Sequence, residues 1–296
     1  MSVMTMSYHV PVLTDEVIAG LQVKAGGSYI DCTVGEGGHS KAILDASAPN
    51  GQMLGIDLDP QALEAAWDNL QSSRDRLVLT NDNFGNLLKI ARDNGFYSVD
   101  GVLLDLGLSS LQLEAGSRGF SFRADEPLDM RFGPSLGISA WEVVNRYSQD
   151  DLAWIIKTYG EEWRADRIAK EVVENRPIDT SLQLAQVVMK AIRGPWGRTH
   201  PATRTFQAIR IQVNSEMGNL DQVLRQAISL LEHGGRFAVI SYHSLEDRLV
   251  KNFFRQESKE VKSIQLINKK IISPSQAEVR SNHRSRSARM RVAERI

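Results

Sequence analysis

The sequence predicts an α/β fold in which a parallel sheet with helices on both faces carries an all-helical insertion. Short apolar runs alternate with helical stretches from residue 28 to residue 106, which is the rhythm of strand–helix–strand units. The alternation then stops, and three helical patterns follow without a strand until an apolar run returns at Arg236. A chain of 296 residues is long enough for one large domain, or for one domain that carries a second.

Five strands are expected where apolar residues cluster and end in polar or turn residues. In chain order they cover residues 28–33, 52–58, 76–79, 101–106 and 236–242. Helices are expected between them at residues 39–47, 60–71, 84–94 and 217–232. Gly234-Gly235 is expected to end the last of these helices. This order of elements predicts a parallel sheet that is covered on both faces.

The helical insertion is expected at residues 113–205, between the fourth and fifth strands. It opens with a loop at 113–135 that is rich in Gly, Ser, Arg and Asp. Helical patterns follow at residues 148–158, 161–175 and 181–193. The remaining residues, 1–112 and 206–296, are expected to form the core. An insertion at the carboxyl ends of parallel strands would overhang the crevice in which open α/β sheets bind ligands.

A glycine-rich loop follows the first expected strand and reads Val34-Gly35-Glu36-Gly37-Gly38-His39-Ser40. Glycine lets the backbone approach a ligand where a side chain would clash. Twenty residues after Gly37, Asp57 stands at the tip of the second strand, where a carboxylate can accept hydrogen bonds from ribose hydroxyls. The loop and the carboxylate together predict a nucleoside site. The alternative is a tight turn whose glycines serve packing alone.

The residue types in this loop discriminate between nucleosides. The third glycine of a dinucleotide fingerprint would be residue 40, which is Ser40, and the Gly-Lys-Ser/Thr ending of a phosphate-binding loop does not occur. Glu36 lies inside the loop, where it disfavours a pyrophosphate. The loop therefore favours a cationic, phosphate-free nucleoside such as S-adenosylmethionine over NAD.

Three further side chains stand at expected strand ends. Asp105 could accept a hydrogen bond from an amine of the cofactor or the substrate, or it could serve as a turn or N-cap aspartate. Phe84 could pack on an adenine ring or in the core. His243 is a candidate proton acceptor, while Ser244 with Asp247 resembles a helix-capping pair. Six His and one Cys show no metal-ligand spacing, so no metal site is expected, and a G-x-S-x-G hydrolase elbow does not occur.

The net charge of −1 hides an uneven distribution. Residues 246–296 hold 13 Lys and Arg against 6 Asp and Glu, and residues 180–215 hold five basic residues and no acidic one. Such segments suit an anionic partner such as nucleic acid, and Trp196 and His200 could stack on unpaired bases. The alternatives are a solvated basic tail and a surface neutralised by acids from elsewhere in the fold. The candidate RNA-binding residues are Arg198, His200, Arg204, Arg210, Arg284 and Arg286.

The C-terminal tail is the most arginine-rich part of the chain, with six Arg and one Glu at residues 280–295. Two structures are expected for it, either a disordered arm or, because residues 288–293 alternate, an edge strand. In both cases its arginines would suit phosphate contacts.

Longer motifs in this chain identify a family. The chain closely resembles the bacterial 16S rRNA (cytosine-N(4))-methyltransferases that act in the decoding centre of the small ribosomal subunit. The motifs are His9–Leu13, 31–40, 104–110 with Gln112, 118–122, 127–131, the string His-Pro-Ala-Thr-Arg-Thr-Phe-Gln-Ala at 200–208, and His-Ser-Leu-Glu-Asp-Arg at 243–248. They span nearly the whole chain in order. Residues 32–36 depart from many members, and the stretch between His243 and the tail is longer in some members.

The resemblance implies a Rossmann-like, S-adenosylmethionine-dependent methyltransferase core with an inserted helical domain at 113–205 for RNA recognition. The implied cofactor residues are Gly37, Gly38, His39, Asp57, Phe84, Asp105 and Gln112. The implied reaction is N(4)-methylation of a cytosine in 16S rRNA, with the small ribosomal subunit as partner. Asp105 and His243 are the candidate catalytic residues.

Two rival functions are a nicotinamide-dependent oxidoreductase, which the missing third glycine disfavours, and a non-catalytic RNA-binding assembly factor. The chain lacks an apolar run of the ~18 residues that a membrane span requires, its first residues lack the features of a secretion signal, and Cys32 is its single cysteine. We therefore expect a cytoplasmic protein without a membrane partner. The residues leave the oligomeric state open, with a homodimer as one expectation.

Overall fold

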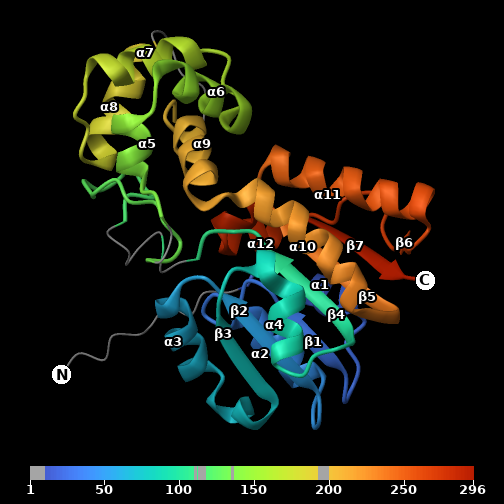
Figure 1. Cartoon of the computed structure of the whole chain (residues 1–296). Helices are drawn as coiled ribbons and strands as arrows, with labels where there is room; N and C mark the ends of the chain where they lie inside the picture. Colours follow the sequence, from blue (N-terminus) through green and yellow to red (C-terminus); the bar gives the residue numbers. More distant parts are fainter. Residues whose placement is uncertain (1–10, 110–111, 113–117, 135–136, 193–199) are drawn as a thin grey trace, which may run out of the picture. The chain divides into compact units, whose positions relative to one another are not determined.

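The computed structural model describes residues 11–109, 112, 118–134, 137–192 and 200–296. The chain forms two compact units, which Figure 1 shows in sequence colours. The first unit consists of Met1–Ser109 with Gly218–Ile296, and the second of Ser110–Met217. Among the helices of the described ranges, none combines the length and the apolar character needed to cross a membrane.

A seven-stranded sheet forms the centre of the first unit, in the order β3-β2-β1-β4-β5-β7-β6. Its strands are β1 (Ser28–Asp31), β2 (Gln52–Asp57), β3 (Leu77–Asn81), β4 (Val99–Asp105), β5 (Leu231–Ser241), β6 (Ile264–Leu266) and β7 (Arg289–Arg295). Strands β1 to β5 are parallel, and β7 is antiparallel to both of its neighbours. The strand order reverses between β1 and β4, and ligands of open α/β sheets bind at such a reversal. The Rossmann-like fold class predicted from the sequence is confirmed.

Helices cover both faces of this sheet (Figure 1). They are α1 (Thr14–Leu21), α2 (Gly38–Ala46), α3 (Pro60–Asn69), α4 (Leu87–Asp93), α10 (Glu216–Leu230), α11 (Ser244–Gln256) and the short α12 (Gln276–Ser281). On one face, Tyr29, Leu103 and Ala238 join a core with α1, α2 and α3. Their strand neighbours point to the other face, where Phe237 packs edge-on against Phe254 of α11. Burial on both sides explains why the parallel strands read as continuous apolar runs.

The glycine pair at 234–235 corrects the predicted end of α10. The helix ends at Leu230, and the glycines lie inside β5. There Leu231 pairs with Val99 and Arg236 with Gly101, so five residues of β5 advance against two of β4. Gly234 has a φ of 81°, which the resulting bulge requires. The two glycines therefore mark an irregularity in β5, and our prediction that they end the preceding helix is wrong.

The C-terminal strand corrects a second expectation. Strand β7 is ordered and lies between β5 and β6, so it is neither a disordered arm nor an edge strand. The edge is formed by β6, whose three residues are too few to be recognised as a strand from the sequence.

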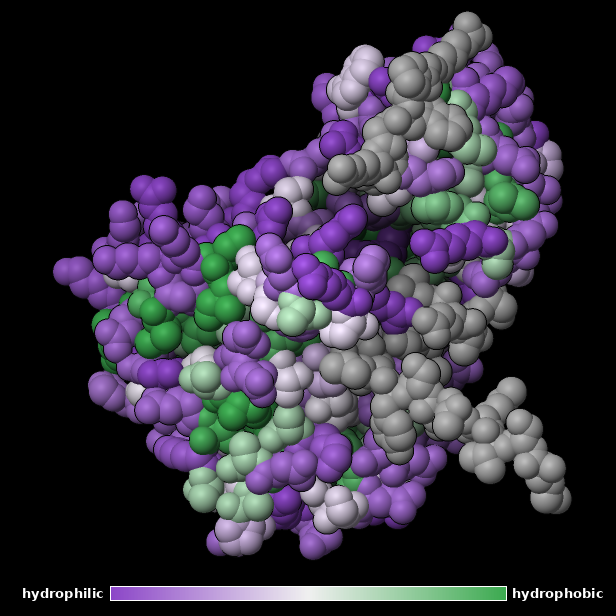
Figure 2. All heavy atoms as spheres, turned by 180° about the vertical axis from the view of Figure 1, so that it is seen from behind, coloured by the Kyte–Doolittle hydropathy of each residue, from purple (hydrophilic) through white to green (hydrophobic). Residues whose placement is uncertain are grey.

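Figure 2 shows apolar patches on an otherwise hydrophilic surface. The exposed apolar side chains of the C-terminal region are Val261, Leu266, Ile267, Ile271 and Ile296.

The second unit is built from helices α5 (Ala140–Arg146), α6 (Gln149–Gly160), α7 (Ala165–Glu174), α8 (Ser181–Ala191) and α9 (Thr203–Asn214). Helix α5 was not expected from the sequence. Helix α9 packs on α6, because Gly160 lets the backbone of Arg204 come close and Gln207 donates to the carbonyl of Tyr159. The compact unit thus extends to Met217, whereas we expected the insertion to end at residue 205.

Candidate functional site

The candidate site lies in the first unit, at the carboxyl ends of the parallel strands. Asp31 ends β1, Asp57 ends β2 and Asp105 ends β4. Because β1 lies between β2 and β4, the three carboxylates stand along one sheet edge at the reversal of strand order. The glycine-rich loop joins β1 to α2 at the same edge.

The loop glycines have different reasons to be glycine. Gly37 has a φ of 88° at the N-cap of α2, and a Cβ there would come 3.1 Å from Leu70. A Cβ on Gly38 would come 3.2 Å from Pro11. Gly35 has a φ of 53°, and a Cβ there would meet no described atom within 4 Å. Packing therefore accounts for the glycines at 37 and 38, while Gly35 leaves open space beside the strand ends.

Asp57 ties the loop to the second strand. One of its carboxylate oxygens accepts from the amide of Gly35 at 2.8 Å, and the other accepts from the amide of Asp59 at 2.9 Å. Burial outweighs these hydrogen bonds and raises the pKa of Asp57 to about 6. Each carboxylate oxygen can accept more than one hydrogen bond, so both remain able to bind hydroxyls of a ligand.

A buried network links Asp31 to the end of β4. Asp31 accepts from the hydroxyl of Ser40 at 2.7 Å and from the amide of Thr33 at 3.1 Å. The hydroxyl of Thr33 in turn accepts from the amide of Asp105 at 2.7 Å. Burial raises the pKa of Asp31. We did not single out Asp31, Thr33 or Ser40 from the sequence, although a polar residue at the end of a buried apolar strand was a usable signal.

The Asp105 carboxylate differs from the other two in its hydrogen bonding. Its Oδ1 is buried and has no hydrogen-bond partner among the described residues. Its Oδ2 lies 3.4 Å from Nε2 of His39, whose two ring nitrogens are also buried and without a hydrogen-bond partner there. On the other side, the Tyr242 side chain forms a hydrogen bond with the Asp105 carboxylate, and burial together with this carboxylate raises the pKa of Tyr242. Buried polar atoms without partners are rare in folded proteins, and here they point to a bound ligand.

The turn after β3 holds Phe84 in place. Asn83 caps a short 3₁₀ helix, Phe84–Asn86, by accepting from the amide of Gly85 at 2.8 Å. Gln226 of α10 donates to the carbonyl of Gly85 at 2.6 Å and accepts from the amide of Leu88 at 2.7 Å. Phe84 itself is half-buried, so part of its ring remains accessible at the end of β3.

His243 has a structural position at the start of α11. Its Nδ1 accepts from the amide of Glu246 at 3.3 Å, and the Glu246 carboxylate accepts from the amides of His243 and Tyr242. His243 is thus the N-cap of a capping box, a role that we had expected of Ser244. Its Nε2 lies 3.0 Å from the Glu246 carboxylate.

Several basic side chains with a candidate RNA role have acidic neighbours in the second unit. Arg210 forms a bidentate, largely buried pair with Glu216, with both distances 2.7 Å. Lys190 pairs with Glu171, and Arg204 lies 3.8 Å from Glu162. Acids from outside residues 180–215 therefore neutralise part of this segment, as the alternative interpretation of the sequence proposed.

The other predicted RNA and cofactor residues are dispersed. His200 stacks on Phe122 with ring centroids 4.3 Å apart. Arg284 is half-buried and Arg286 is exposed in a 3₁₀ turn, His283–Ser287, before β7. Gln112 is buried and belongs to the second unit. Arg198 lies outside the described residues.

The polar side chains at the carboxyl ends of the strands fit a cationic nucleoside. Three carboxylates meet there, and buried, unpartnered acceptor oxygens occur on Asp105 and Glu36. Such acceptors suit an ammonium or sulfonium group, whereas a pyrophosphate would be repelled. The open space beside Gly35 and the spare acceptor capacity of the half-buried Asp57 carboxylate suit a ribose.

Comparison with known proteins gives consistent matches over almost the whole chain. The sequence model of the MraW methylase family matches residues 6–296. A protein named ribosomal RNA small subunit methyltransferase H from Dehalococcoides mccartyi is 50% identical over 307 residues, which covers 99% of this chain and 88% of that protein. Proteins of the same name from Syntrophus aciditrophicus and Clostridioides difficile are 47% and 43% identical, and the alignments cover 98% of this chain and 98% and 99% of theirs.

Proposed function

This chain belongs to the MraW methylase family, and on that premise we propose that it methylates ribosomal RNA of the small subunit with S-adenosylmethionine as the methyl donor. The finer proposal is that the acceptor is the exocyclic N4 of a cytosine in the decoding centre of 16S rRNA. The observation that carries the proposal is Asp105, whose buried Oδ1 lacks a partner among the described residues at the switch point of the sheet.

The chain's own residues can divide the work of holding the cofactor. Asp57, fixed by the amides of Gly35 and Asp59, would accept the ribose hydroxyls. Gly37, Gly38 and His39 would line the loop side together with Gly35. The exposed part of Phe84 would lie beside the adenine. The bound cofactor supplies an electrophilic methyl group on a sulfonium.

Asp105 is the proposed catalytic residue. The amino nitrogen of cytosine is a poor nucleophile, because its lone pair is delocalised into the ring. An acceptor that binds an amino hydrogen favours charge development on this nitrogen and orients it toward the methyl group. Asp105 Oδ1 is such an acceptor, and Thr33 holds the backbone that carries it. The cytosine must be unpaired or flipped out of its stack to reach the residue.

Two parts of the proposal concern other residues. We propose His243 as a second proton acceptor. Its Nδ1 accepts from the amide of Glu246, so the neutral ring carries its hydrogen on Nε2, and His243 would take up a proton at Nδ1 at the expense of the α11 cap. We also propose that the second unit recognises RNA. Gln112 is proposed to contact the cofactor, and the arginines at 204, 284 and 286 are proposed to contact RNA. A second copy of the chain is a proposed partner that sedimentation equilibrium would detect.

Asp105→Asn tests the mechanism, since asparagine keeps the shape and removes the charge. We expect kcat/KM for methyl transfer to small-subunit RNA to fall by about 100-fold or more, the scale seen when one preorganised polar group is removed. Calorimetry with S-adenosylhomocysteine checks that the cofactor still binds. Asp100→Asn is the matched control, because Asp100 lies near the other end of β4 and pairs with Lys24. Equal rates for the two variants would refute the role of Asp105.

The acceptor itself is tested by mass spectrometry of rRNA from cells with and without this protein. Loss of one N4-methylcytosine in the small-subunit RNA is expected. An unchanged modification pattern together with retained RNA binding would favour a non-catalytic assembly factor, and NAD binding in the calorimeter would favour an oxidoreductase.

A further inference from the structure

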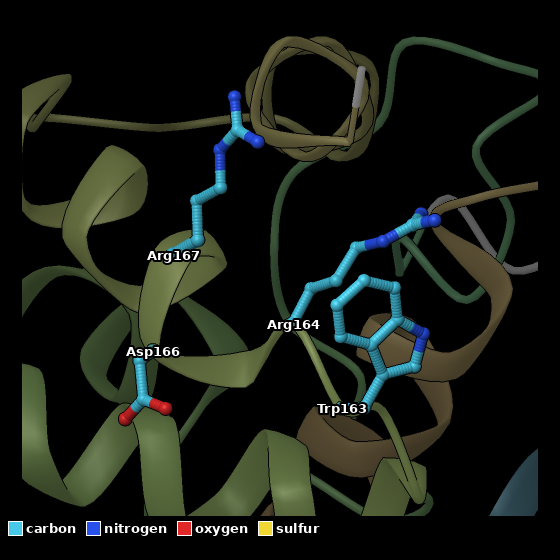
Figure 3. Close-up of a pocket in the computed structure, with 4 residues that line it drawn as sticks. All are labelled: Trp163, Arg164, Asp166 and Arg167. Carbon is cyan, nitrogen blue, oxygen red and sulfur yellow. The ribbon is translucent and has the colours of Figure 1, made fainter. Parts of the chain in front are cut away.

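An exposed tryptophan flanked by arginines stands on the segment that joins α6 to α7. We propose that this surface, the Trp163 patch of Trp163, Arg164 and Arg167, binds an unpaired nucleotide of the RNA substrate. Figure 3 shows the three side chains around a shared cavity of about 330 Å³. The proposal rests on the proposed function and adds a binding surface to it.

The geometry suits stacking. Trp163 is 76% exposed, although burial of an indole is strongly favourable. The guanidinium of Arg164 lies 4.4 Å from the centroid of the indole ring, close enough for a cation–π contact. Unpaired bases bind to such aromatic and guanidinium planes. The cavity volume is at the lower end of the range for small-molecule sites, which suits one base.

The charge of the patch suits a phosphate. The guanidinium groups of Arg164 and Arg167 have no ion pair within 4 Å in the described ranges, unlike Arg210 and Lys190 of the same unit. Asp166 also lines the cavity, but Figure 3 shows its carboxylate pointing away from both arginines. One positive charge therefore lies on the indole face, and a second, that of Arg167, lies on the same cavity, where, together with Lys190, it also lowers the pKa of Glu171.

The backbone under the patch is firmly held. Glu161 ends α6 in the left-handed region, with a φ of 50°. The next residue, Glu162, is buried and accepts from the amide of Arg164 at 3.0 Å. Ala165 is buried on the other side. Trp163 is thus presented outward by a segment whose neighbours are anchored, and a preorganised contact loses little conformational entropy on binding.

A protein partner is the competing occupant. A protein surface would be expected to bury a larger apolar area than one indole, whereas a nucleotide needs only a ring face and a cation. RNA is therefore the occupant that these residues favour.

The test is equilibrium binding of the full-length protein to protein-free 16S rRNA, over a range of salt concentrations. We expect Trp163→Ala to weaken binding by about 5- to 150-fold, the scale for one stacked base. The double variant Arg164→Gln with Arg167→Gln should weaken binding. It should also make the slope of log affinity against log salt concentration less negative by about 1.4 to 1.8. In turnover, KM for RNA should rise while kcat is kept. Far-ultraviolet circular dichroism and thermal unfolding of each variant check that the helical unit is folded.

Trp154→Ala is the matched control. Trp154 is also exposed in the helical unit, at 55%, but its ring contacts Tyr159 and, among the described residues, no guanidinium. Equal losses for the variants at 154 and 163 would overturn the proposal, and so would a loss seen only with assembled subunits, which would indicate a protein partner. If wild-type protein methylates neither the free RNA nor the assembled small subunit, the proposed function fails. If wild-type protein binds and methylates the RNA and the patch variants bind it equally well, the proposed role of the Trp163 patch fails and the proposed function stands.

Discussion

At the scale of single residues, the three strand-end carboxylates differ in what they still have to bind. Asp31 is fully buried and bound by Ser40 and Thr33, so it holds the loop. Asp57 is bound by two amides and keeps spare acceptor capacity. Asp105 alone of the three has a buried oxygen without a described partner. We therefore propose a structural role for Asp31, a ligand-binding role for Asp57 and a chemical role for Asp105.

The raised pKa of Asp57 predicts that cofactor binding depends on pH. The ribose hydroxyls require the carboxylate, and a pKa of about 6 means that Asp57 takes up a proton as the pH falls through 6. Affinity for S-adenosylhomocysteine should be constant above about pH 7 and fall toward tenfold per pH unit below 6. Calorimetry from pH 5 to 8 measures this, with Asp57→Asn as a control that should bind weakly and without this dependence. A flat profile for wild type would contradict the role of Asp57.

The candidate site was partly predictable from the sequence. Asp57 and Asp105 were found because each follows an apolar strand, and strand ends share one edge of a parallel sheet. The pair of Arg210 with Glu216 was missed, because the sequence shows a charge but not which side chain folds against it. His243 was assigned to chemistry alone, because capping boxes are usually recognised by Ser or Thr at the first position.

At the scale of secondary structure elements, α11 and β7 are joined by one carboxylate. Asp247 accepts from Arg291 of β7 at 2.7 Å and lies 3.5 Å from Arg289. Asp247 and Arg291 are mostly buried. The motif at 243–248 therefore has a structural task, since it caps α11 and ties it to the C-terminal strand. Two of the tail arginines that we expected to bind phosphate are engaged here.

Asp247→Asn should lower the free energy of unfolding by about 1–3 kcal/mol, because Arg291 would lose its charged partner in a mostly buried position. The control is Asp221→Asn, which breaks an exposed pair with Arg225 within α10 and should cost less than about 0.5 kcal/mol. Urea unfolding of both variants, followed by far-ultraviolet circular dichroism, makes the comparison. Equal costs would show that the link between α11 and β7 contributes nothing beyond a surface pair.

The elements that the sequence predicted are the long periodic ones. Strands β1 to β4 were located to within about two residues of their ends, because both faces are buried and the apolar runs are continuous. Strand β6 is too short to show a pattern, and β5 starts five residues early because its glycines allow a bulge. The order of β7 and β6 depends on pairings across the sheet, which local sequence does not contain.

At the scale of the whole molecule, we propose different binding roles for the two units. The residues that we propose to bind the cofactor lie in the first unit, apart from Gln112, and the Trp163 patch lies in the second. Hydrogen exchange with S-adenosylhomocysteine at 100 times its Kd should show added protection of up to about 2.7 kcal/mol in the first unit. In the second unit, protection is expected only near Gln112. General protection of α6 to α8 would contradict this division.

The insertion also determines how the sheet is completed. Asp105 and Ile240 pair across β4 and β5 although 135 residues separate them in the chain. Closing a loop of n residues costs about (3/2)RT ln n, so each doubling adds only about 0.6 kcal/mol. Helices α6, α7 and α8 follow one another and pack on their chain neighbours, so they can form before the strands meet and shorten the flexible connection. A helical unit of this size therefore costs the sheet little stability, and its main effect is on the rate at which β5 finds β4.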